Sequence, residues 1–173
     1  MATKTLGNDF MQLIADEGAW KELSGDLSWT ETMLEKYQDK IDWQELSENR
    51  NILWTIPMLQ KFKHRINWDK LSRYADEKVL TENCIETFKE KWNWNELSSN
   101  CCITNELLEK FVDKWDWETV IDDYRSNLFS NVSAIEFYER YKEYIPAAKL
   151  QRSSLWNKIV EQRKKQIISE ITA

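Results

Sequence analysis

The stretch TNELLEKFVDKWDWETV, residues 104–120, decides the fold because the chain repeats its pattern. Five short phrases begin with tryptophan: WKELS, WQELS, WDKLS, WNELS and the looser WETVI. Their tryptophans stand at positions 20, 43, 68, 94 and 117, so successive spacings are 23, 25, 26 and 23 residues. A near-constant period of this length is typical of repeat proteins. The sequence therefore predicts tandem repeats of about 23–26 residues.

A threonine marks the rigid part of each repeat. Threonines at 30, 55, 81 and 104 each precede the next phrase tryptophan by 13 residues, so the length variation falls elsewhere. Apolar residues follow each threonine at positions +4, +7 and +11, which is one helical stripe at about 100° per residue. These residues are Leu34, Tyr37, Ile41, Leu59, Phe62, Ile66, Ile85, Phe88, Trp92, Leu108, Phe111 and Trp115. The stripe predicts helices of about three turns over 30–42, 55–67, 81–93, 104–116 and 131–144.

Capping residues stand at both helix starts. Each threonine can accept a hydrogen bond from an amide in the first turn, and an apolar residue precedes it, as in a hydrophobic staple. Before the phrase tryptophans stand Asp42, Asn67, Asn93 and Asp116, which predict the N-caps of a second, shorter helix. Variable loops are expected near 48–54, 73–80, 99–103 and 122–130. Because nine of the ten tryptophans recur in these columns, we interpret them as core residues rather than as stacking platforms for sugars or bases.

Composition limits the class of protein. The 173 residues include only 3 glycines and 2 prolines, which favours helices over turn-rich β architectures. The net charge of -6 disfavours generic nucleic-acid binding. No apolar run approaches the roughly 20 residues needed to span a membrane, and the N-terminus lacks an apolar signal-peptide core. We therefore expect no membrane partner, a cytoplasmic location and reduced thiols at Cys84, Cys101 and Cys102.

Together these patterns predict an all-α fold, a right-handed helical-repeat array (α-solenoid) of helix–loop–helix repeats. Residues 1–173 are expected to form one domain. In it, 1–19 form an N-terminal cap, 20–144 about five repeats, and 145–173 a basic C-terminal capping helix. The N-terminal cap would use Phe10, Leu13 and Ile14, whereas the last repeat would begin at Asn131. In that repeat Ile135 and Tyr138 would match the apolar columns, with Tyr144 two residues beyond the +11 position.

The repeats resemble a known family. Tandem sequences close to EKFxDKWDWxxLSxNxxIxW(S/T)xxLL occur in proteins of bacteria and large DNA viruses, and residues 104–117 and 43–59 are similar to them. The resemblance covers about residues 20–120. The asparagine of LSxN is present at Asn49 and Asn100, but Tyr74 replaces it in the middle repeat. The resemblance implies a helical repeat array, and it brings no catalytic residues with it.

No motif predicts a reaction. The single histidine, His64, and the adjacent Cys101 and Cys102 do not supply the several closely spaced ligands of a metal site. The three glycines are isolated, so no loop can hold a phosphate, and no Gly-x-Ser-x-Gly elbow is present. The sequence therefore predicts no catalytic residue, no metal site, no cofactor and no enzymatic activity.

One basic surface is the candidate binding site. It contains five residues: Lys61, His64, Arg65, Lys70 and Arg73. We call these five residues the basic ridge. The leading hypothesis is a non-enzymatic protein-interaction scaffold that binds an acidic protein segment. One alternative is nucleic-acid binding through basic helices 61–73 and 158–165, and a second is an enzyme whose site forms across repeats.

Overall fold

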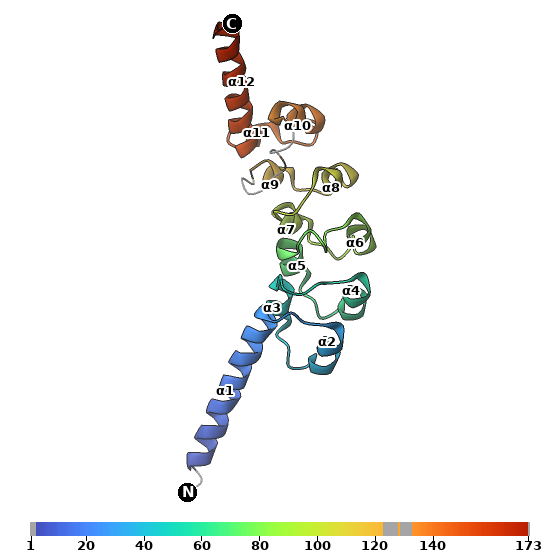
Figure 1. Ribbon diagram of the computed structural model, residues 1–173, viewed down its shortest axis with the longest axis vertical. Helices are drawn as coiled ribbons and strands as arrows, with labels where there is room; N and C mark the ends of the chain where they lie inside the picture. The colour runs from blue at the N-terminus through green and yellow to red at the C-terminus, as the bar shows by residue number, and fades with distance from the viewer. Residues whose placement is uncertain (1–2, 123–127, 129–132, 173) are drawn as a thin grey trace. The chain divides into compact units, whose positions relative to one another are not determined.

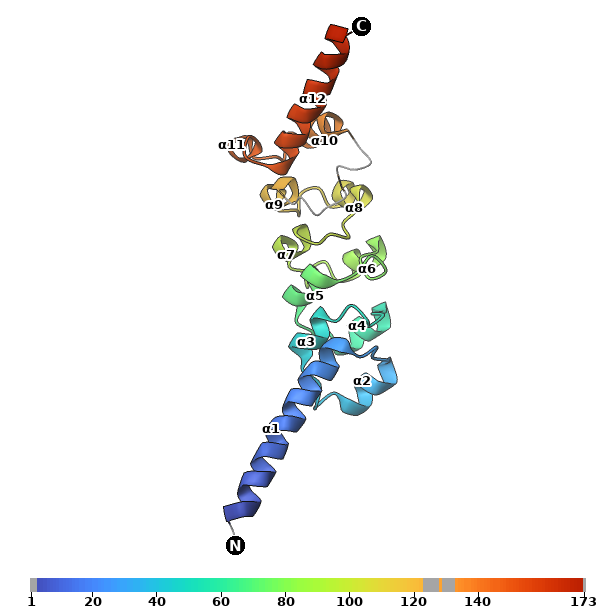
Figure 2. The ribbon, with the colours of Figure 1, turned by 60° about the vertical axis from the view of Figure 1, so that its left-hand side comes forward.

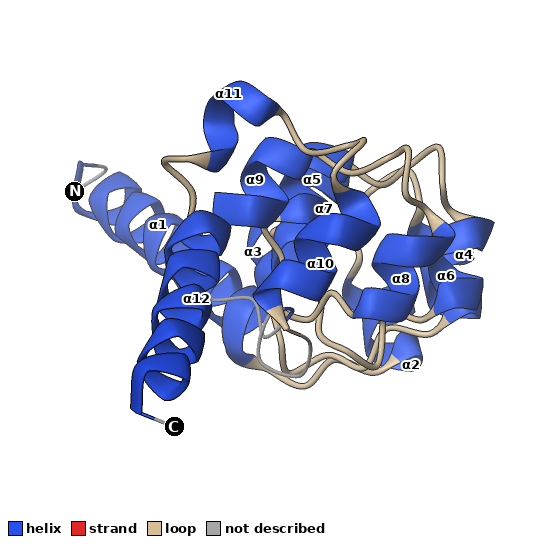
Figure 3. Cartoon of the chain, turned by 90° about the horizontal axis from the view of Figure 1, so that it is seen from above, coloured by secondary structure: helices blue, strands red, loops and turns tan. Residues whose placement is uncertain are grey.

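The computed structural model describes residues 3–122, 128 and 133–172, with side chains from residue 12 onward. Every regular element in this part of the chain is a helix, labelled α1 to α12 (Figures 1 and 3). The all-α prediction is therefore confirmed. The chain divides into two compact units, Met1–Thr87 and Phe88–Ala173, which are described separately below.

The first compact unit alternates two kinds of helix. Its elements are α1 (Thr3–Asp26), α2 (Glu31–Tyr37), α3 (Trp43–Glu48), α4 (Ile56–Phe62), α5 (Trp68–Tyr74) and α6 (Glu82–Thr87). The end of α1 packs against α3, and α3 packs against α5. These helices carry the tryptophan phrases, whereas α2, α4 and α6 follow the threonines and lie beside them in a second row (Figures 1 and 2). Packing between alternate helices is the arrangement expected of a repeat array.

The second compact unit continues the same alternation. Its elements are α7 (Trp94–Ser98), α8 (Asn105–Lys110), α9 (Trp117–Asp122), α10 (Ala134–Tyr141), α11 (Ala147–Leu150) and α12 (Ser154–Thr172). Helix α9 packs against α7, α11 and α12, and α10 also packs against α12. The phrase helices α7 and α9 again form one row, with α8 and α10 in the other (Figures 1 and 2).

The predicted caps are present. Thr30, Thr55, Thr81 and Thr104 each accept a hydrogen bond from the amide three residues later, at 3.3–3.4 Å. The shorter helices begin in the same way, since the Asp42 carboxylate accepts from Gln44 N at 2.9 Å. The corresponding side chains of Asn67, Asn93 and Asp116 do the same. Local sequence thus sets where these capped helices begin.

The predicted apolar stripe forms the core. The +4 residues Leu34, Leu59, Ile85 and Leu108 are all completely buried. Phe62, Phe88 and Phe111 at +7 and all four +11 residues are buried too, whereas Tyr37 is half-buried. Within each compact unit a phrase tryptophan meets the following repeat: Trp43 contacts Phe62 and Trp94 contacts Phe111, with ring centroids 5.4 and 5.6 Å apart. Aromatic pairs at this separation stabilise beyond the area they bury.

The longer helices end earlier than predicted. They stop at Tyr37, Phe62, Thr87 and Lys110, about five residues short of the expected ends. The first of them shows the reason, because two of its backbone groups bind side chains and not each other. The Gln38 carbonyl accepts from Trp43 Nε1 at 3.0 Å, and the Asp42 amide donates to Ser24 Oγ at 3.0 Å. In a continuing helix the Asp42 amide would donate to the Gln38 carbonyl. The chain therefore leaves the helix, and the +11 residue reaches the core from a turn.

The phrase serines link successive repeats, a role the sequence did not reveal. Ser47 is buried, donates to the Trp43 carbonyl at 2.6 Å and accepts from the Asn67 amide at 2.9 Å. Ser24 makes the same two bonds one repeat earlier. Ser98 binds the Asp116 amide at 2.9 Å in the second compact unit. Each of these serines thus joins the end of one repeat to the cap of the next.

The last predicted repeat has a different register. Asn131, its expected cap, lies outside the described residues, and α10 begins after Ser133. Ile135 and Tyr138 are half-buried and Tyr144 is exposed, so these three residues do not form the predicted stripe. The buried residues are Phe137, Tyr141 and Ile145. Ile145 N donates to the Tyr141 carbonyl at 3.2 Å, and Ile41 N donates to the Tyr37 carbonyl in the same way. Tyr141 and Ile145 therefore correspond to the +7 and +11 residues of the other repeats.

Candidate functional site

The structure places the basic ridge on and between α4 and α5, opposite carboxylates of the preceding repeat. Lys61 on α4 contacts both Glu31, at 3.1 Å, and Glu35 of α2. Arg65 donates to Asp39 at 3.1 Å and to a backbone carbonyl. Lys61 and Arg65 of the ridge therefore each pair with carboxylates of the preceding repeat.

The rest of the ridge lies close by. Lys70 on α5 pairs with Glu48 of α3, and this carboxylate raises the pKa of the Lys70 ammonium above its ordinary value. His64 is exposed in the turn after α4, and Arg73 is exposed on α5. Exposed ion pairs contribute little to stability, so these contacts adjust the register of repeats more than they hold the fold together.

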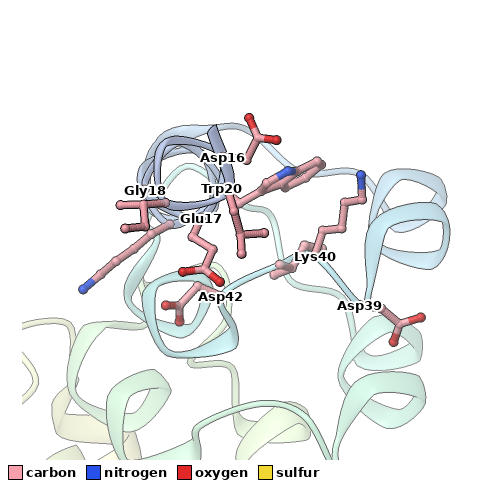
Figure 4. A pocket seen from close by; sticks show the side chains of 11 residues that line it. Asp16, Glu17, Gly18, Trp20, Asp39, Lys40 and Asp42 are labelled. Atoms are coloured by element: carbon pink, nitrogen blue, oxygen red, sulfur yellow. The ribbon is translucent and has the colours of Figure 1, made fainter. Parts of the chain in front are cut away.

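A groove of about 790 Å³ lies between α1 and the turn that joins α2 to α3 (Figure 4). Its apolar lining consists of Leu13, Ile14, Trp20 and Ile41. Its charged lining consists of Asp16, Glu17, Asp39 and Asp42 with Lys21 and Lys40. The groove thus combines an apolar floor with a rim that has more carboxylates than ammonium groups.

The groove exists because α1 does not follow the repeat pattern. Other repeats place an apolar residue and then a cap before the phrase tryptophan, as Ile41 and Asp42 do before Trp43. Before Trp20 the corresponding residues are Gly18 and Ala19, which offer neither a core side chain nor a capping oxygen. Helix α1 therefore continues through this point, and a Cβ added at Gly18 would meet no atom within 4 Å.

Trp20 stands at the centre of the lining. Its ring contacts Tyr37, with centroids 5.5 Å apart, and Lys40 Nζ lies 5.4 Å from the ring centroid. Figure 4 shows Trp20 beside Lys40, with Glu17 and Asp42 near each other below them. Trp20 is half-buried, as are Trp43, Trp68 and Trp94, so part of its side chain is accessible. Trp20 also lines the groove, and tryptophan is enriched among the residues that dominate binding energies at interfaces.

Several charged groups of the rim already have roles within the chain. Asp42 caps α3, Asp39 pairs with Arg65, and Lys21 pairs with Glu45 at 3.2 Å. Asp16 and Glu17 lie exposed on α1. No group of three or more metal-ligating side chains occurs among the described residues. The groove therefore offers apolar contact and negative charge.

The cysteines lie elsewhere. Burial raises the pKa of the Cys84 thiol to about 11, so this thiol stays protonated at neutral pH. Cys101 and Cys102 are half-buried free thiols whose sulfur atoms lie 3.8 Å apart, within reach of a thiol–thiol hydrogen bond. None of the three lines the groove.

The sequence predicted the ridge but missed the groove. One signal was present in the sequence, because Gly18 and Ala19 stand where each of the other four tryptophan phrases is preceded by an apolar residue and a cap. Only the structure shows that this exception opens a surface next to Trp20.

In the described part of the chain, no helix is both long and apolar enough to cross a membrane. Comparisons with protein-family models, with curated proteins and with solved structures each find no match.

Proposed function

We propose that this chain is a non-enzymatic protein-interaction scaffold that acts in the cytoplasm and binds a helical segment in the groove beside Trp20. Right-handed stacking of its repeats and membership of the tandem repeat family that it resembles belong to the same proposal. The recurrent serine and tryptophan hydrogen bonds support a repeat array. The observation that carries the proposal is the groove, whose apolar floor surrounds a half-exposed tryptophan.

The shape of the groove favours a helix over a small molecule. Its α1 lining residues include Leu13, Glu17, Trp20 and Lys21, which share one helix face at intervals of three to four residues. This face extends over about 12 Å along the helix axis. An amphipathic helix that lies in an apolar groove is a recurrent mode of peptide recognition.

The charge of the site favours a basic partner. The lining holds four carboxylates and two lysines. The basic ridge, by contrast, has Lys61 and Arg65 engaged by Glu31, Glu35 and Asp39. We therefore assign the ridge to linking repeats, and this assignment also weakens the case for nucleic-acid binding along residues 61–73.

A photo-crosslinking experiment tests the proposal. The full chain carrying benzoylphenylalanine in place of Ile14 is irradiated in extract from its native source, and a chain carrying it in place of exposed Glu90 is the matched control. We expect a defined protein adduct at position 14 that excess unlabelled wild-type chain competes away. Identical adducts at both positions, or none at position 14, would refute the groove as a protein-binding site.

A further inference from the structure

We infer that the groove beside Trp20 takes helix α12 of a second copy of this chain. The inference rests on the proposed function and names the partner. Such binding would make the protein self-associate through two different surfaces, the groove and helix α12, each of which occurs once in every copy. The argument comes from the exposure, the apolar pattern and the charge of α12.

Only the first half of α12 packs within its own compact unit. Leu155 is completely buried, and the Gln162 side-chain oxygen accepts from Ser133 Oγ and from the Ile135 amide, both at 3.3 Å. From Arg163 to Thr172 every residue of the helix is exposed. The second half of α12 is thus an exposed helical extension, along which Arg163 lies 3.7 Å from Glu170.

An apolar stripe runs along α12 from Val160 into this extension. Val160, Ile167 and Ile171 are 47%, 41% and 78% exposed, and at about 100° per residue they fall within about 40° of one another. Ile168, which is 51% exposed, lies next to them. An exposed stripe of branched aliphatic residues is costly in water and indicates a contact surface. It spans about 16 Å along the helix, which is close to the 12 Å or so of the α1 lining.

The charges of the two surfaces are complementary. Arg163 and Lys164 lie on either side of the stripe, and Lys158 and Lys165 add to the positive charge of α12, against Glu161 and Glu170. Asp16 and Glu17 are exposed along the α1 side of the groove. A basic helix with an apolar stripe therefore matches an acidic groove with an apolar floor.

The two surfaces differ, so the contact is heterologous. One copy can donate α12 while its own groove accepts α12 of another, and such contacts close into rings or continue into chains. The association is therefore expected to increase with protein concentration and to weaken as salt screens the charges.

Sedimentation velocity on the full chain, from micromolar to high micromolar concentrations, tests the inference. A groove variant carries Asp16→Lys and Glu17→Lys, and a tail variant carries Arg163→Glu and Lys164→Glu. We expect the wild type to associate and each variant alone to associate roughly tenfold or more weakly, because two attractions become repulsions. Mixing the two variants should restore association, since each basic surface then meets an acidic one.

A matched control carries Glu90→Lys and Asp113→Lys, two acidic reversals outside the groove, and should associate like the wild type. Circular dichroism must show unchanged helicity in every variant. A wild type that stays monomeric throughout, or a mixture that stays monomeric, would overturn the inference. Crosslinking from position 14 in a mixture of isotope-labelled and unlabelled chains distinguishes adducts between copies from adducts within one copy. An adduct to α12 of the same chain would also overturn the inference.

Failure of this inference can be told apart from failure of the proposed function. A monomeric wild type that still forms a competed adduct at position 14 with another protein would retain the groove as a binding site but remove the second copy as its occupant. A monomeric wild type with no such adduct would remove both.

Discussion

Residues 39–43 and residues 16–20 occupy the same place in the repeat, but only the first stretch ends a helix. In residues 39–43 the chain turns, and Asp42 caps α3. In residues 16–20 the helix α1 continues without a break. Both stretches lead into a phrase tryptophan, so the tryptophan alone does not end a helix. At residues 39–43 the turn has a capping side chain and a serine bond from the preceding repeat, whereas residues 16–20 have no capping side chain before the tryptophan.

The two tryptophans are both half-buried but have different neighbours. Trp43 donates to the Gln38 carbonyl and packs against Phe62, a buried ring of the next repeat. Trp20 packs against half-buried Tyr37 and lines the groove. The same sequence phrase therefore supplies a contact between repeats in both places, and beside Trp20 it also lines a groove.

The largest expected effect breaks a repeat interface. Phe62→Ala should lower the free energy of unfolding by about 3–5 kcal/mol, since it removes a buried ring and leaves a cavity beside Trp43. Tyr37→Ala at the first interface should cost less, about 1–3 kcal/mol, because Tyr37 is only half-buried. Urea unfolding of both variants measures this. Equal losses would show that the first interface is packed like the others.

The next effect concerns the serine link. Ser47→Ala should cost about 1–3 kcal/mol, because the Asn67 amide loses its acceptor in a partly buried place. Exposed Ser28→Ala is the matched control and should leave the free energy of unfolding within about 0.5 kcal/mol of the wild type. If the Ser47 variant were as stable as the Ser28 variant, the bond from Ser47 would not stabilise the link between the repeats.

The beginnings of the repeat helices could be predicted from the sequence, whereas their ends could not. Caps such as Thr30 and Asp42 act on amides within three residues, so a local pattern contains all the information. The ends depend on bonds such as that between Asn67 N and Ser47 Oγ, which joins residues 20 positions apart. The predicted helices are about five residues too long because their ends depend on bonds between residues far apart in the sequence, which a local pattern does not show.

The candidate site was less predictable for a related reason. The basic ridge is visible as a run of positive residues, but its carboxylate partners come from the preceding repeat, as Glu31 does for Lys61. The groove arises where Gly18 and Ala19 fail to end a helix, so it is defined by missing side chains. In α10, apolar residues at both 137 and 138 allowed two neighbouring registers, and the sequence favoured the wrong one.

A smaller effect tests the cap directly. Asp42→Ala should cost about 1 kcal/mol, because the carboxylate accepts from the amides of Gln44 and Glu45. Thr81→Ala should cost a similar amount, since it removes one cap bond from the Cys84 amide. Thermal unfolding followed by circular dichroism gives both values. A loss above that of Phe62→Ala in either variant would contradict the assignment of these residues to caps.

The smallest effect has the opposite sign. Gly18→Ala should stabilise α1 by about 0.5–1 kcal/mol, because glycine within a helix is unfavourable and the added methyl group meets no atom within 4 Å. The far-ultraviolet helical signal and the urea midpoint should both rise slightly. A decrease in either would indicate that the chain bends at Gly18 in solution, as the other repeats do at the corresponding position.

Amide hydrogen exchange at Asn67 tests most directly the claim that a serine from one repeat ends the helix of the next. In the wild type, the Asn67 amide should be protected, because it donates to Ser47 Oγ at 2.9 Å. In Ser47→Ala its exchange should accelerate at least about tenfold, whereas the Leu71 amide, which donates to the Asn67 carbonyl, should change little. Equal protection of Asn67 in both proteins would contradict the account.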